Sequence, residues 1–96
     1  MSGGDWKSMF KAIQEGDLEL VKMYLNMGID PNYQHPEFMA SPLVESIRFN
    51  QLEIAKLILE SGGNPLIKEV MGGDTPILVA ERLKNTKAIN LLNLYS

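Results

Sequence analysis

The 96-residue chain has no cysteine and a single histidine, His35. Without cysteine the chain can form no disulfide framework, no thiolate nucleophile and no cysteine-ligated metal site. A lone histidine can complete neither a zinc site nor a nucleophile dyad. The sequence therefore predicts no metal site, no cofactor and no catalytic residues, and we do not expect an enzyme.

Long apolar runs and a strong net charge are also missing. No apolar stretch approaches the roughly 18 residues of a membrane-spanning helix, and the opening Met-Ser-Gly-Gly-Asp lacks the charged and apolar regions of a secretory signal. A net charge of -3 creates no field that would attract phosphate backbones. We expect a cytoplasmic protein that binds neither nucleic acid nor a membrane.

What the sequence does contain is an internal repeat. Residues 52–56, Leu-Glu-Ile-Ala-Lys, match residues 18–22, Leu-Glu-Leu-Val-Lys, and Ser41-Pro42-Leu43 matches Thr75-Pro76-Ile77 at the same separation. Ile54, Leu57 and Ile58 match Ile89, Leu92 and Asn93 at a separation that is longer by one, which predicts one inserted residue between Pro76 and Asn85. The repeat period is thus about 34 residues, and self-similarity at such a period is typical of stacked-repeat proteins.

Apolar spacing and capping residues predict two helices in each copy of the repeat. Asp17 and Ser41 are suited to cap helix starts, and Gly28 and Gly62 to end helices. The expected helices span 5–15, 18–27, 42–49 and 52–61, followed by one that opens at Thr75-Pro76 and one over about 86–95. We expect a flexible N-terminus over 1–4 and a single domain over 5–96, with repeats at about 5–32, 33–65 and 66–96.

The order of residues resembles the ankyrin repeat, whose unit of about 33 residues carries Thr-Pro-Leu-His-x-Ala. The resemblance runs from about residue 5 to 94. It rests on Gly73-Asp74-Thr75-Pro76, on Gly-Asp-Leu-Glu-Leu-Val-Lys at 16–22 and on Gly-Ile-Asp-Pro-Asn at 28–32. It implies an all-α solenoid of about three helix-turn-helix units joined by extended or β-hairpin loops. The tetratricopeptide repeat has a similar period but lacks long linkers such as the one between Gly28 and Pro42.

Two departures from the ankyrin pattern carry structural expectations. Val44 and Leu78 replace the histidine that follows Thr-Pro-Leu. We therefore expect apolar packing in place of the hydroxyl-imidazole hydrogen bond that links the Thr-Pro-Leu segments of adjacent repeats. Met39 replaces a glycine before the second repeat and should disfavour a positive φ. The first linker is therefore expected to have its own shape.

The resemblance implies that a concave face, built from loop tips and first helices, binds a partner protein. Carried over by position, and favouring aromatic and arginine side chains, the candidate binding residues are Trp6, Tyr33, His35, Phe38, Arg48, Phe49, Met71 and Arg82. Two interpretations stay open for Trp6 and Phe38, which could instead seal the stack, and His35 could be an ordinary loop residue. Glu45, paired with Glu53, is expected on a solvated helix face rather than in catalysis.

The predicted function is that of a non-catalytic protein-protein interaction module. One alternative is a small acidic inhibitor or immunity-type protein that neutralises a toxin or enzyme. Another is a self-associating assembly protein, because Leu91, Leu92, Leu94 and Tyr95 leave only a narrow polar side on the C-terminal helix. Otherwise a monomer is expected.

Overall fold

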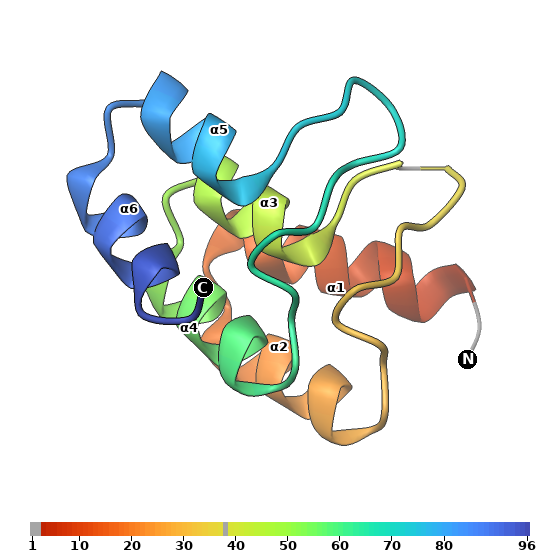
Figure 1. The fold of residues 1–96 in the computed structure, drawn as a ribbon. Coiled ribbons are helices and arrows are strands. Elements are labelled where there is room, and N and C mark those ends of the chain that lie inside the picture. The colour runs from red at the N-terminus through yellow and green to blue at the C-terminus, as the bar shows by residue number, and fades with distance from the viewer. Residues whose placement is uncertain (1–2, 38) are drawn as a thin grey trace.

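The computed structural model describes residues 3–37 and 39–96 and is all-helical in these ranges (Figure 1). The six helices follow the chain as three pairs. They are α1 (Gly3–Glu15), α2 (Leu18–Asn26), α3 (Pro42–Arg48), α4 (Leu52–Glu60), α5 (Pro76–Arg82) and α6 (Thr86–Asn93). The all-α repeat architecture is confirmed. The first helix begins at Gly3, somewhat before the expected start at Asp5.

The helices form two rows. The first helices of the pairs, α1, α3 and α5, pack side by side, and so do the second helices α2, α4 and α6. The two long linkers leave the stack on the same side and run next to each other (Figure 1). We call the exposed surface of α1, α3, α5 and the linkers the inner face, and the exposed surface of α2, α4 and α6 the outer face.

The core lies between the rows and is built around α3. All residues from Pro42 to Ile47 are buried, because α3 is covered by α1 on one side, α5 on the other and α4 behind. Equivalent positions of neighbouring repeats stack on one another: Phe10 in α1 corresponds to Val44 in α3, and both are fully buried. Neither helix of a pair could bury its apolar stripe alone, so stacking supplies the stability.

Special backbone positions recur at the repeat period without a shift. Gly16, Asn50 and Lys84 have positive φ angles of 78°, 57° and 55° in the turn between paired helices, and the N-caps of the second helices are Asp17, Gln51 and Asn85. The predicted insertion in the third repeat is therefore wrong. Ala88 and Leu92, both buried, occupy the places of Ile54 and Ile58. Matching isoleucine with isoleucine had shifted the alignment by one residue.

The linkers are extended loops with no strand among the described residues. Met39 has a φ of 53° and Gly73, at the equivalent position of the next linker, a φ of 69°, so the methionine adopts the conformation that it was expected to disfavour. A hydrogen bond of 2.7 Å from the Met39 amide to the His35 carbonyl closes the turn and offsets part of the strain. Phe38 lies outside the described residues, as does the predicted flexibility of residues 1–2.

No helix in residues 3–37 or 39–96 is both long enough and apolar enough to cross a lipid bilayer.

Candidate protein-binding surface

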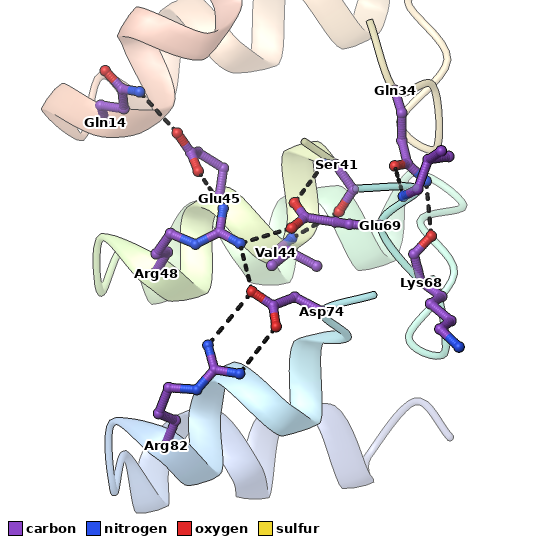
Figure 2. A network of polar contacts seen from close by, with 11 residues as sticks. Gln14, Gln34, Ser41, Val44, Glu45, Arg48, Lys68, Glu69, Asp74 and Arg82 are labelled. Carbon is purple, nitrogen blue, oxygen red and sulfur yellow. Dashed lines mark hydrogen bonds and ion pairs between the residues drawn. The ribbon is translucent and has the colours of Figure 1, made fainter. Parts of the chain in front are cut away.

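Arg48, near the end of α3, is the centre of a polar network on the inner face (Figure 2). Its Nη1 lies 2.7 Å from Glu45 Oε1, and its Nη2 lies 2.7 Å from Glu69 Oε1 and 3.2 Å from Asp74 Oδ2. Glu45 and Glu69 are buried, with 8% and 4% of their surface exposed. One guanidinium therefore compensates two carboxylates that have little access to water.

The remaining oxygens of these carboxylates bind groups from the other repeats. Glu45 Oε2 accepts a hydrogen bond of 2.8 Å from Gln14 Nε2 in α1. Asp74 Oδ1 lies 3.0 Å from Arg82 Nη2 in α5. Gln14, Arg48 and Arg82 lie one repeat period apart, so one side-chain position in each inner helix contributes to a continuous ladder of polar contacts.

The network also links adjacent repeats at the start of α3, where Val44 stands in place of the histidine of the repeat pattern. Glu69 Oε2 accepts a hydrogen bond of 2.9 Å from the Ser41 amide, while Ser41 Oγ accepts one of 3.0 Å from the Val44 amide and caps α3. Val44 packs in the core as expected, but the tie between adjacent repeats is a buried carboxylate. The prediction that apolar packing alone replaces the hydrogen bond is therefore wrong.

The ionisation of the exposed end of the ladder follows from its ion pairs. Hydrogen bonds from Arg82 first, and from Arg48, hold the pKa of Asp74 below its ordinary value although partial burial opposes this. Asp74 in turn raises the pKa of Arg82. Burial alone would lower the pKa of Arg48, but hydrogen bonds with Glu69 and Glu45 outweigh it and the pKa is raised. All three groups are charged at neutral pH.

Side-chain amides of the first linker bind the backbone of the second. Gln34 Nε2 donates to the Lys68 carbonyl at 3.0 Å, and Gln34 Oε1 accepts from the Val70 amide at 2.8 Å (Figure 2). Asn32 makes the same kind of double contact, with the Gly62 carbonyl and the Asn64 amide. The second linker is thus fixed at two points. Gln34 binds its backbone, and its own Glu69 binds Arg48 and the Ser41 amide.

Large apolar side chains remain exposed on this fixed frame. Val70 and Met71 at the tip of the second linker are 76% and 63% exposed, and Phe49 at the end of α3 is 45% exposed. Tyr33 in the first linker is 42% exposed, and its ring packs against that of Trp6 in a tilted arrangement, with 4.8 Å between ring centroids. Exposed aromatic and methionine side chains on a rigid support are typical of protein-binding surfaces.

The structure separates the predicted binding residues into three groups. Tyr33, Phe49, Met71 and Arg82 are exposed on the inner face, where their role in binding stays a prediction. Trp6 is only 6% exposed and packs against Phe10 and Tyr33, which favours the interpretation that it seals the stack, and its role in binding stays a prediction. Arg48 is held by three carboxylates. His35 is half-buried, with its ring 6.2 Å from that of Tyr33 and its Nδ1 accepting from the Glu37 amide.

Sequence reasoning did not find the residues that hold the surface together. Glu45 was expected to be solvated, but it is buried, as is Glu69, because Arg48 neutralises both carboxylates. Gln34 was not singled out, and Asp74 was named only as part of the repeat motif. The spacing of Gln14, Arg48 and Arg82 at the repeat period was the available signal, since it places three long polar side chains in one row.

Stacked helix pairs with long linkers and a fixed recognition surface define the class of helical repeat scaffolds. Within that class, the family of ankyrin repeats, in three copies, matches residues 9–95, and the chain belongs to the ankyrin repeat family. Proteins of this family are generally modules for protein-protein interaction, without catalysis of their own.

Curated relatives are longer than this chain. An ankyrin repeat protein of Acanthamoeba polyphaga mimivirus is 30% identical over 88 residues, which are 92% of this chain and 53% of that protein. The human 2-5A-dependent ribonuclease is 31% identical over 72 residues, which are 75% of this chain and 10% of the enzyme. A fowlpox virus ankyrin repeat protein is 29% identical over 86 residues, 90% of this chain and 14% of that protein. The chain thus spans about half the length of the mimivirus protein and far less of the others.

Proposed function

We propose that this chain binds a partner protein through its inner face, with Phe49, Met71 and Tyr33 as apolar anchors. The observation that carries the proposal is the exposure of these side chains on a frame fixed by the Arg48 ladder and the Gln34 bridge. Binding to a fixed surface loses little conformational entropy, so apolar contact area converts more fully into affinity. The family's general role in protein-protein interaction supports the same conclusion.

Arg48 and Arg82 have different roles in this proposal. Arg48 is engaged by three carboxylates and supports the surface rather than contacting the partner. The side chain of Arg82 is 62% exposed and shares a single carboxylate, Asp74. Its outward guanidinium edge is therefore free to meet an acidic or carbonyl group of the partner.

The experiment compares an inner-face variant with a matched control. F49A/M71A removes two exposed anchors, and M27A/L94A removes two side chains that are at least as exposed on average but lie outside the inner face. Proteins from the native host are captured with each variant, and the dissociation constant of the captured partner is then measured. We expect F49A/M71A to weaken binding at least about tenfold and the control to stay within about twofold. Equal affinities for the two variants would place the binding site elsewhere.

The C-terminal end of the stack offers less support for self-association than the sequence indicated. Glu81 and Asn93 occupy the positions at which the central repeat buries Ile47 and Leu59 against its neighbour. The stacking side of the last repeat is therefore polar where the central one is apolar, although Leu94 is exposed.

A further inference from the structure

The outer face carries a hollow with an apolar floor. It has a volume of about 460 Å³ and lies over α4, between α2 and α6. It forms because α4 packs less extensively against α2 and α6 than α3 packs against α1 and α5. Its floor consists of four partly exposed leucines, Leu18, Leu52, Leu57 and Leu91.

The rim of the hollow is charged and balanced. Three glutamates and three lysines form it: Glu19, Glu53, Glu60, Lys22, Lys56 and Lys87. All six are exposed, and none belongs to an ion pair with another described residue. Their charges cancel, so the net charge of -3 resides on the rest of the chain. Two copies of this acidic protein can therefore bring these faces together without adding a net repulsion there.

The order of residues along the helices makes the face complementary to itself. In α4 the outward positions are Leu52, Glu53, Lys56 and Leu57, so a second α4 running in the opposite direction places Lys56 over Glu53 and Leu57 over Leu52. In α2 the order Leu18, Glu19, Lys22, Met23 has the same symmetry.

We propose that the outer face is a homodimer interface, in which the α2 and α4 helices of two copies face each other in antiparallel order. A twofold axis parallel to the stack brings Glu19 opposite Lys22 and Glu53 opposite Lys56 of the second copy, and the reverse pairs form by symmetry. The methylene stems of the lysines cover the leucine floor of the opposite hollow while their ammonium groups meet the glutamates. The inner face stays open, so dimerisation doubles the number of partner sites per particle.

Charge reversal tests this pairing with the whole chain. K22E/K56E leaves four glutamates and E19K/E53K leaves four lysines at the two pairs of positions, so each variant repels itself while the two variants attract each other. Mass is measured by sedimentation equilibrium at low salt up to about 1 mM protein, and circular dichroism confirms that each variant is folded. K7E/K11E, which makes the same change of charge on exposed positions of α1, is the control.

The expected result is a wild-type mass that rises from 10.7 kDa towards twice that value with concentration, and a control that behaves alike. Each charge-reversed variant should dimerise at least about tenfold more weakly, and the equimolar mixture should recover wild-type association. A wild-type mass constant at 10.7 kDa, or two variants whose mixture does not associate, would overturn the proposal. Because neither of the two charge-reversed outer-face variants changes an inner-face residue, either outcome leaves the test of partner binding unaffected.

Discussion

Arg48 Nη2 and Glu69 Oε1 meet at 2.7 Å although 21 residues separate them in the sequence, and the glutamate is 4% exposed. A buried carboxylate that loses its only cationic partner keeps its desolvation cost without compensation. The pair therefore ties the second linker to α3, and removing Arg48 would leave the Glu69 carboxylate buried without a cation.

Replacing Arg48 with alanine should lower the free energy of unfolding by about 2–3 kcal/mol, because Glu45 and Glu69 lose the guanidinium that compensates them. R82A is the matched control, since Arg82 is largely exposed and its removal should cost clearly less than that of Arg48. Urea unfolding followed by circular dichroism measures both. Similar losses for the two variants would mean that burial does not strengthen the Arg48 contacts.

Asp74 should make stability depend on pH under acidic conditions. Its folded-state pKa is lowered from 3.8, so its ion pairs contribute fully above that value and their contribution is lost as the pH falls through the lower folded-state pKa. The urea midpoint of the wild type should fall more steeply than that of D74N between about pH 5 and about pH 2.5. Parallel midpoints over this range would show that the carboxylate of Asp74 is not stabilised by folding.

Replacing Gln34 with alanine should loosen the tip of the second linker without unfolding the chain. The Val70 amide donates to Gln34 Oε1, and losing a hydrogen bond of about 1 kcal/mol should speed its hydrogen exchange roughly fivefold. E37A changes an exposed residue of the first linker, to which Gln34 also belongs, and should leave the exchange of Val70 unchanged. An unaltered Val70 exchange rate in Q34A would show that the bridge does not hold the tip.

Met39 offers a position where glycine should stabilise the protein. A left-handed backbone costs a side-chain-bearing residue about 1–2 kcal/mol, and glycine avoids this at a smaller entropic cost. M39G should therefore raise the free energy of unfolding by about 0.5–1 kcal/mol, whereas A40G, at a half-buried neighbour with no positive φ, should lower it. Thermal and urea unfolding decide between the two signs. Destabilisation of M39G would indicate that packing of the methionine outweighs its strain.

Trp6 and Phe49 should respond differently to truncation. W6A removes a buried ring that packs on Phe10 and Tyr33 and should cost about 3 kcal/mol. F49A removes a half-exposed ring and should cost less than about 1 kcal/mol. Equilibrium unfolding of the two variants measures the difference. A small loss of unfolding free energy in W6A would indicate that Trp6 contributes little to the core and is available for surface contacts.

The repeat and the helices could be predicted because they depend on local signals. Ser41 and Thr75 before proline start the inner helices, and Gly28 and Gly62 end the outer ones. The register of the last helix was mistaken because Ala88 fills a buried position that isoleucine holds in the central repeat. Residue type alone could not show that a smaller side chain occupies the same place.

The polar ladder could not be predicted because its contacts are non-local. Glu45 follows a pattern that suits a solvated position, and only the approach of Gln14 and the conformation of Arg48 make its burial favourable. Glu69 is one of several polar residues in a linker without periodicity. Its role depends on the Ser41 amide 28 residues away, which no local pattern encodes.

The ladder of Gln14, Arg48 and Arg82 also affects the cooperativity of unfolding. In a linear stack each repeat adds its own stability and one term for each neighbour. Here the neighbour terms include a buried charge, because Arg48 of the second repeat compensates Glu69 of the third, and the loss of the second repeat would leave Glu69 uncompensated. Partly unfolded chains that keep one or two repeats are therefore penalised, and the three repeats should melt in a single cooperative transition.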